Sequence, residues 1–436
     1  MKLHIESPGP AFKPEYAYIR QVVFEHFLGI PTLLSTGRHA DSWRIHTPAG
    51  GLDLPNAFFP EAAPETFLDS ARIPEKAHRV TFRDNEYAAM FAAPTPEDPG
   101  VDILGTIFFL LTSFEDHLAL PRDEYDCLRP ESTWMGRNDL LLRPIVDELL
   151  DLLEYLLRRS EVNFPARRRD YAFVYSCDVD RPTLWHSMPW PLYLRELAGS
   201  LVKRFSPKEF AGRLAATFSA AHDPFYTFGW ICEQLEAAGT SGCFNFGGQG
   251  NHPLYDMSYS LASPAIRDIL ALLTRRGHEI GFHPSYRAAD DERVFKDELK
   301  GLKAAYSGDI RGGRQHYLRF KGASTWRWWE EAGLEYDSSL GYNGAPGFRC
   351  GTAREFPVFD LERRIRLSLC ERPLIAMEGT LLHILGFTHA ETFDLLVSLS
   401  NTIRKSGGSM TMLWHNSTLV SFSDRELFKE AIKALA

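Results

Sequence analysis

From Tyr171 onward, short apolar segments alternate with amphipathic helical patterns, and this alternation most constrains the fold. The expected strands are Tyr171 to Cys177, Gly242 to Phe246, His278 to His283, Gln315 to Phe320 and Met410 to His415. The expected helices are Phe225 to Ala238, Pro264 to Arg276, Asp291 to Tyr306 and Ser324 to Ala332. Because strands that alternate with helices are typical of parallel sheets, the sequence predicts an α/β domain here.

Polar side chains stand at the same end of these expected strands. Asp178 and Asp180 close the first strand, Asn245 lies near the end of the second, and His283 and His415 close two others. The carboxyl ends of strands carry the site in βα barrels, so we expect these residues to converge. The two aspartates are two residues apart, which places both on one side of an extended chain. Buried carboxylates need a cationic neighbour, so a catalytic or metal-binding site is predicted.

A separate, smaller α/β domain is predicted for residues 1–165, followed by a second domain at residues 166–436. The first domain ends in two helical patterns, Ile103 to His117 and Leu140 to Arg159. The segment after them, Val162 to Asp170, contains three consecutive arginines and is interpreted as a solvated linker.

The second domain is expected to contain an insertion at about residues 183–223. This segment is rich in Trp and Leu and is much longer than the usual loop between a strand and a helix. We expect it to form short helices of its own.

Composition and charge exclude several classes of protein. The 436 residues, of which 44% are hydrophobic, are enough for two or three globular domains. With a net charge of -9 and no long Lys/Arg stripe, the chain is not expected to bind nucleic acid. It has no apolar run of about 18 residues, so no integral membrane span is expected. Its six scattered cysteines and the absence of a signal-peptide pattern predict reduced thiols and a cytoplasmic location.

Four further segments follow the aspartate pair in a characteristic order. They are Gly277-His278-Glu279-Ile280-Gly281-Phe282-His283-Pro284, Arg314-Gln315-His316-Tyr317, Asp337-Ser338-Ser339-Leu340 and Leu413-Trp414-His415-Asn416. Together they resemble the NodB-homology polysaccharide deacetylases, carbohydrate esterase family 4, in a divergent branch, from residue 171 to about 420. The resemblance implies a distorted (β/α)7-type barrel. Residues 1–165 resemble the uncharacterised domain that often precedes this branch.

The resemblance implies that Asp178 is the general base and that Asp180 binds a divalent metal. That metal is usually Zn, with Co, Ni or Mn as alternatives. The aspartates are adjacent in the family, whereas Val179 separates them here. The roles could therefore be exchanged, with Asp180 as the base and Asp178 as the metal ligand.

The implied metal ligands depart from the family pattern at one position. His283 fits the first of two histidines spaced four apart, but the second falls at Arg287. A catalytic zinc takes about three protein ligands, so one donor is missing. His316, Asp290 and solvent are the alternatives, and His316 is favoured because it lies in the third motif. His278, early on its strand, is expected to be a core or supporting residue.

The remaining implied roles concern the reaction itself. Arg314 would orient the base, Tyr317 would offer its backbone N–H to the oxyanion, and His415 would protonate the leaving amine as general acid. Glu378 and Asp337 are candidates for tuning His415 or for binding sugar hydroxyls.

The implied activity is that of a hydrolase that cleaves a linear amide C–N bond in carbohydrate metabolism. It would remove an N-acetyl group from an amino sugar of a surface-glycan precursor or polysaccharide. Nucleotide-linked and lipid-linked saccharides are among the candidate substrates. Two alternatives stay open: a non-catalytic carbohydrate-binding relative, which would explain the missing histidine, and an amidohydrolase acting on a non-sugar amide. A glycosidase fits less well, because it needs carboxylates about 5 to 9.5 Å apart across its substrate.

Overall fold

A computed structural model describes most of the chain. The described residues are 2–37, 40–59, 64–93, 99–165, 167, 170–184, 194–195, 198, 211, 214–215, 222–248, 250, 255–257 and 259–436. The predicted helical insertion at about 183–223 lies outside the described residues for most of its length. The chain divides into two compact units. The first holds residues 1–171, 320–375 and 401–410, and the second holds 172–319, 376–400 and 411–436.

A four-stranded sheet of order β2-β1-β3-β4 opens the first unit. Its strands are β1 (Leu3–Ser7), β2 (Thr32–Thr36), β3 (Ser42–His46) and β4 (Leu52–Pro55). β1 pairs in parallel with β2 and antiparallel with β3. Along β1 the buried residues are Leu3, Ile5 and Ser7, the period of two that is expected when one sheet face is covered. α1 (Lys13–Ile19) and the π-helix η1 (Arg20–Phe27) connect β1 to β2.

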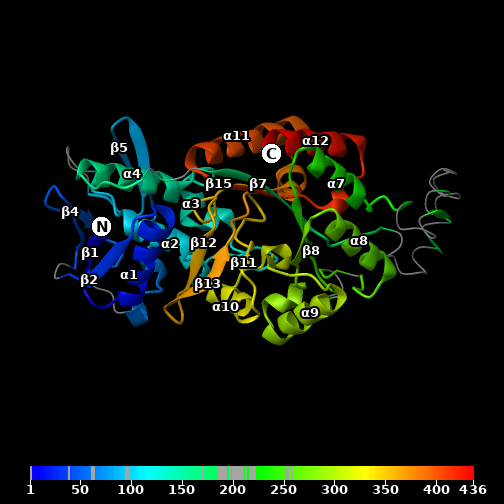
Figure 1. Cartoon of the computed structure of the whole chain (residues 1–436), viewed down its shortest axis with the longest axis horizontal. Helices are drawn as coiled ribbons and strands as arrows, with labels where there is room; N and C mark the ends of the chain where they lie inside the picture. Colours follow the sequence, from blue (N-terminus) through cyan, green and yellow to red (C-terminus); the bar gives the residue numbers. More distant parts are fainter. Residues whose placement is uncertain are drawn as a thin grey trace. The chain divides into compact units, whose positions relative to one another are not determined.

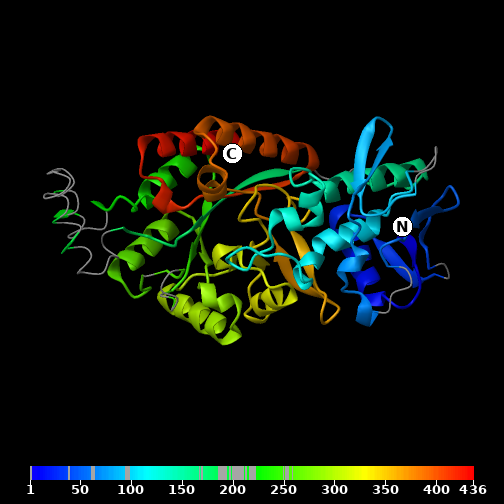
Figure 2. The same cartoon turned by 180° about the vertical axis from the view of Figure 1, so that it is seen from behind.

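Two helices of the first unit correspond to the predicted patterns. α2 (Ile103–Leu111) is buried along its whole length, and its N-cap Asp102 accepts a hydrogen bond from the Gly105 N–H at 2.9 Å. α2 ends earlier than predicted: the left-handed Ser113 (φ +49°) interrupts it before the 3-10 turn η4 (Phe114–His117). α4 (Ile145–Arg159) packs against the hairpin of β5 (His78–Phe82) and β6 (Asn85–Ala89), which is light blue in Figure 2.

The interpretation of residues 162–170 as a solvated linker is wrong at Arg167. This side chain is buried, and its Nη1 donates to Asp147 Oδ1 at 2.8 Å while its Nη2 pairs with Asp151. A buried guanidinium needs carboxylate partners, and the first turns of α4 provide them. Arg168 and Arg169 lie outside the described residues.

The first unit also contains a later part of the chain. This part consists of α10 (Ala323–Glu331), β11 (Tyr336–Asp337), β12 (Phe356–Asp360) and β13 (Ile365–Glu371). β13 pairs antiparallel with β12 and in parallel with β11. The domain boundary between residues 165 and 166 stays a prediction, and sequence patterns did not reveal that this unit is discontinuous.

The strands of the second unit follow the order β10-β9-β8-β7-β15-β14. They are β7 (Tyr171–Asp178), β8 (Gly242–Phe246), β9 (Glu279–Phe282), β10 (Gly312–Gly313), β14 (Ala376–Met377) and β15 (Gly408–Leu413). β7, β8, β9 and β10 pair in parallel in succession, as do β14 and β15. The expected mixed α/β architecture is confirmed and is consistent with a distorted barrel. The sevenfold repeat stays a prediction.

Helices flank this sheet in the second unit (Figure 1). They are α7 (Phe228–Ala237), α8 (Pro264–Arg275), α9 (Glu292–Ala305), α11 (His389–Ser406) and α12 (Phe422–Leu435). α12 contacts α7, α7 contacts α8, and α8 contacts β9. α8 begins at Pro264 after the N-cap Ser263, as predicted.

The predicted strand from Gln315 to Phe320 is wrong. β10 is only Gly312–Gly313, and the chain then forms the 3-10 turn η8 (His316–Leu318). Tyr317 and Leu318 both have φ of +56°, a left-handed conformation that residues with a Cβ rarely adopt. Two such residues in succession turn the chain out of the sheet direction.

No helix among the described residues is long and apolar enough to span a membrane. All six cysteines are free thiols, and five of them are buried. The cytoplasmic location stays a prediction.

Gly281 on β9 is required by a close approach. A Cβ at this position would lie 2.0 Å from Asn245 Oδ1 and 3.0 Å from Cys243 Sγ. We predict that Gly281→Ala lowers the free energy of unfolding by about 1–3 kcal/mol, because the neighbouring side chains are buried and cannot move aside freely. Urea denaturation measures this change.

The matched control is Gly301→Ala in α9, where no atom beyond the neighbouring residues and the helix's own backbone lies within 4 Å of the added Cβ. Alanine is a better helix former than glycine, so this variant should gain up to about 1 kcal/mol. Equal denaturation midpoints for the two variants would contradict the assigned packing.

Candidate functional site

The aspartate pair lies at the carboxyl end of β7. Asp178 is the last residue of the strand and is aligned with Asn245 on β8. The chain stays extended for one further residue, because the Val179 N–H donates to the Asn245 carbonyl at 2.9 Å. Val179 is fully buried, and alternation along the extended chain directs Asp178 and Asp180 to the same side.

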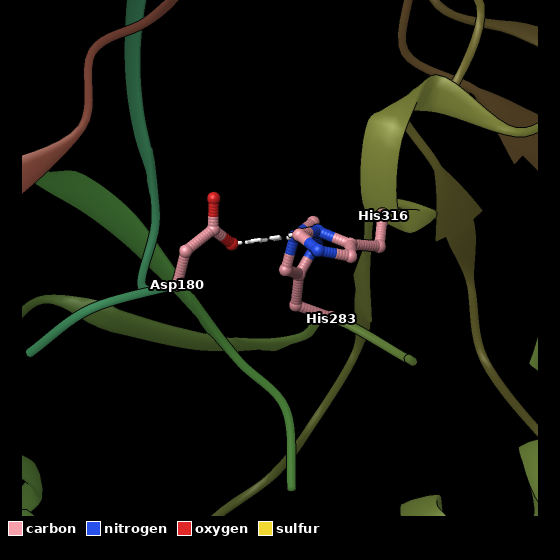
Figure 3. Close-up of side chains that lie close together, drawn as sticks. All are labelled: Asp180, His283 and His316. Carbon is pink, nitrogen blue, oxygen red and sulfur yellow. Dashed lines mark hydrogen bonds and ion pairs between the residues drawn. The ribbon is translucent and has the colours of Figure 1, made fainter. Parts of the chain in front are cut away.

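Asp180, His283 and His316 form a compact cluster within the second unit (Figure 3). His283 directly follows β9, and His316 begins the turn η8. Asp180 Oδ1 lies 3.2 Å from His283 Nε2 and 3.4 Å from His316 Nδ1, and these two nitrogens are 2.9 Å apart. Such a group of one partly exposed carboxylate and two buried imidazoles could hold a metal ion.

Backbone carbonyls determine which nitrogen of each ring carries hydrogen. His283 Nδ1 lies 2.7 Å from the Arg314 carbonyl, and His316 Nε2 lies 2.6 Å from the Tyr255 carbonyl. Because a carbonyl oxygen can only accept, both of these nitrogens must be N–H donors. In the neutral rings, His283 Nε2 and His316 Nδ1 therefore direct lone pairs at each other and at Asp180. Burial would lower the pKa of His283, but Asp178 and Asp180 raise it, so a proton on His283 Nε2 satisfies this geometry when no metal is bound. A metal ion would replace that proton and take all three lone pairs.

The charges of the cluster are strongly coupled. Burial would raise the pKa of Asp180, but His316 and His283 outweigh it and hold that pKa well below its usual range. Burial lowers the pKa of His316 despite the nearby Asp180. His316 is therefore the neutral ring at pH 7, the form in which an imidazole binds a metal.

Asp178 is held beside the cluster by two donors. Its Oδ1 accepts from Arg314 Nη1 at 3.0 Å and from Asn245 Nδ2 at 2.7 Å. Burial would raise the pKa of Asp178, but Arg314 and the nearby histidines lower it. Asp178 is thus an oriented carboxylate at neutral pH, with both donors on one oxygen.

His415 approaches the cluster from the end of β15. Its Nδ1 lies 2.8 Å from Glu378 Oε1, and its Nε2 lies 3.6 Å from Asp180 Oδ2. Burial alone would lower the pKa of His415, but Glu378 and then Asp180 raise it to about 10. The ring is therefore a cation at pH 7. Glu378 is buried and also accepts from the His415 backbone N–H and from Thr418 Oγ1, at 3.1 and 3.2 Å.

Several residues that the sequence suggests as ligands or supporting groups make contacts outside the cluster. Asp290 pairs with Arg319 at 2.7 Å, and Arg287 lies exposed 3.5 Å from Asp291. His278 Nδ1 accepts from the Gly242 N–H at 3.1 Å between β8 and β9. Asp337 belongs to the first unit, where it accepts from Ser339 Oγ at 2.5 Å.

Asn245 and Glu378 support the site through contacts that the sequence does not specify. Asn245 is predicted only to lie near a strand end, and its bond to Asp178 depends on the register of β7 with β8. Glu378 was one of two candidates for tuning His415. No motif separates such partners from other buried polar residues, because the contacts join distant parts of the chain.

Among comparisons with known proteins, one family model matches the first part of the chain. Residues 5–161 match DUF7033, a family of unknown function. No curated protein matches the sequence. Among solved structures, one similar chain is from Mycobacterium smegmatis and is described as a candidate polysaccharide deacetylase. It has 17% sequence identity and a TM-score of 0.41, over 62% of this chain and 85% of that chain. At this TM-score the likeness does not define the fold.

Replacing Glu378 tests the origin of the His415 charge. Because His415 has a pKa near 10 when folded and about 6.5 when unfolded, its stabilising effect is complete below pH 6.5 and is lost as the pH rises through 10. We predict that Glu378→Gln moves the NMR-titrated pKa of His415 down towards 6.5. The decline in unfolding free energy between pH 7 and 10 should also become smaller.

The control is Glu391→Gln, an exposed carboxylate that accepts from the Thr388 N–H at 2.8 Å. Both variants are titrated without metal. If His415 still titrates near pH 10 in Glu378→Gln, the carboxylate is not the cause.

Proposed function

We propose that this chain is a metal-dependent hydrolase that removes an N-acetyl group from an amino sugar. The observation that carries the proposal is the convergence of two imidazoles and the Asp180 carboxylate, with the oriented carboxylate of Asp178 and the cationic His415 close to them. The saccharide class rests on the motif resemblance to the NodB-homology deacetylases.

Asp180, His283 and His316 would hold the divalent metal. Asp180 is the aspartate whose oxygen faces both rings, which supports Asp180 as the ligand and Asp178 as the base. His316 would replace the second family histidine that is missing at Arg287. When bound, a divalent ion there polarises an acyl carbonyl and acidifies an attacking water. Two imidazoles and one carboxylate are donors that suit zinc.

Asp178 would accept the proton of the attacking water. Its Oδ1 is already engaged by Arg314 and Asn245, so Oδ2 is the oxygen available for this transfer. The two donors also prevent the carboxylate from rotating. General base catalysis by a positioned group contributes about 10²- to 10⁴-fold to a rate.

His415 would donate a proton to the leaving amine. The Glu378 carboxylate fixes the Nδ1–H, so the proton to be transferred is on Nε2, the nitrogen that faces the cluster. Tyr317 would offer its backbone N–H to the oxyanion, and Arg314 would act through Asp178. Positioned oxyanion donors of this kind contribute about 3 kcal/mol to transition-state stabilisation.

Acetate release from N-acetylated saccharides tests the proposal. We expect the zinc-loaded protein to release acetate, chelation to abolish the release and added Zn²⁺ to restore it. Asp178→Asn should lower kcat by about 10²- to 10⁴-fold, because the general base is lost while the metal ligands remain. Zinc content measured on the same samples checks that they do.

The matched control is His389→Ala, a histidine of the second unit that pairs with Asp424 at 3.0 Å. It should retain both zinc and activity. Zinc and saccharide binding without any acetate release would favour the carbohydrate-binding alternative. Release of acid only from non-sugar amides would favour the amidohydrolase.

A further inference from the structure

The Tyr259 side chain, in the loop after β8, is buried with 4% of its surface exposed. Its hydroxyl oxygen accepts a hydrogen bond from the Gly247 N–H at 2.9 Å. The hydroxyl also has a hydrogen to donate, and none of the residues that the structure describes accepts it. A buried O–H group without an acceptor is costly, so we expect a ligand oxygen to accept this hydrogen.

The Tyr259 hydroxyl lies where β7 and β8 separate. The Asn245 carbonyl on β8 still accepts from the Val179 N–H of the neighbouring strand at 2.9 Å. Because an extended chain repeats its direction every two residues, the Gly247 N–H points towards that same neighbour. A regular parallel ladder would continue there with a carbonyl of the β7 chain, whereas here the Tyr259 hydroxyl accepts the bond. The hydroxyl therefore lies next to the segment that continues from Val179 to Asp180.

The electrostatics agree with this placement. Burial raises the pKa of Tyr259 well above its usual range, and the nearby Asp180 and Asp178 raise it further. The phenol is therefore neutral at pH 7 and keeps its hydrogen. A neutral donor suits this place, because a cationic side chain would form a strong pair with the carboxylates instead of meeting a ligand.

The strand end that positions the hydroxyl also positions a residue of the cluster. A Cβ at Gly247 would lie 2.2 Å from the His283 carbonyl oxygen and 2.4 Å from Met257 Cε, so only glycine fits there. The Phe246 carbonyl, one residue before Gly247, accepts from the His283 N–H at 2.8 Å. The Tyr259 hydroxyl and the His283 ring are thus held by adjacent residues of one strand, which gives them a fixed relative position.

We propose that the Tyr259 hydroxyl donates a hydrogen bond to the oxygen of the acyl group that is cleaved. The inference rests on the proposed function, because it takes the N-acetyl group as the ligand. As the attacking oxygen adds to the carbonyl carbon, the C=O oxygen gains negative charge, and a positioned O–H group stabilises that charge. The hydrogen stays on Tyr259, so no proton is transferred. This donor would act together with the Tyr317 backbone N–H, and the loop that carries it contains none of the motifs of the resemblance.

Binding of acetate to the zinc-loaded protein tests this donor without requiring turnover. Acetate presents the acyl oxygens of the product, and NMR titration of isotope-labelled acetate measures its dissociation constant. We expect Tyr259→Phe, which removes only the hydroxyl, to weaken acetate binding about tenfold, as the loss of one hydrogen bond to a charged group does. Imidazole binding should be unchanged, because imidazole binds zinc through one nitrogen and has only an N–H group on the other.

Turnover of an N-acetylated saccharide should depend on the same hydroxyl. Tyr259→Phe should lower kcat by about 10²- to 10³-fold with little change in KM or zinc content, because the donor acts mainly in the transition state. The matched control is Tyr306→Phe, which removes the hydroxyl of a partly exposed tyrosine at the C-cap of α9. This control should keep the wild-type acetate affinity and kcat.

The possible results separate this donor from other roles of Tyr259. Unchanged acetate binding in Tyr259→Phe would overturn the donor. Equal weakening of acetate and imidazole would also overturn it, because the hydroxyl would then only hold the Gly247 backbone. Loss of zinc from Tyr259→Phe would do the same, since the hydroxyl would then support a metal ligand. If the wild type binds acetate through Tyr259 but releases none from saccharides, the proposed function is wrong and the donor remains.

Discussion

Two backbone carbonyls determine the chemistry of the site. By accepting the N–H groups of His283 and His316, the carbonyls of Arg314 and Tyr255 turn the other nitrogen of each ring towards Asp180. Both imidazoles are buried, and so is the Asp180 Oδ1 atom that faces them, so water does not compensate for facing lone pairs there, and unpaired buried polar groups are costly. A cation between the three side chains removes this cost. Hydrogen bonds that orient histidine ligands through their second nitrogen are a usual feature of metal sites.

The same loops supply these carbonyls and the strained backbone. Left-handed conformations at Tyr317 and Leu318 cost roughly 1–2 kcal/mol per residue. His316, directly before them, is held by its bond to the Tyr255 carbonyl and by contact with the Tyr317 ring. The energy stored in the turn is thus offset by contacts that also orient a metal ligand.

Helices with a clear spacing of apolar residues were predictable from the sequence. The site was predictable in part. α8 and α9 begin and end within one residue of their predicted bounds, because their apolar spacing and N-caps are local signals. The turn at Tyr317 was missed because nothing local marks a left-handed residue other than glycine. The rule that strand ends converge located Asp178, His283 and His415. The supporting bonds could not be predicted in this way, because they depend on strand register and on which carbonyl a ring meets.

Anomalous diffraction from crystals grown with Zn²⁺ tests the central claim most directly. The account predicts one strong peak in the second unit, with His283 Nε2 and His316 Nδ1 at about 2.0–2.1 Å and an Asp180 oxygen at a similar distance. Each ring should keep its hydrogen bond to the backbone carbonyl. Rings that stay about 3 Å apart around a shared proton at saturating zinc, with no peak between them, would contradict it.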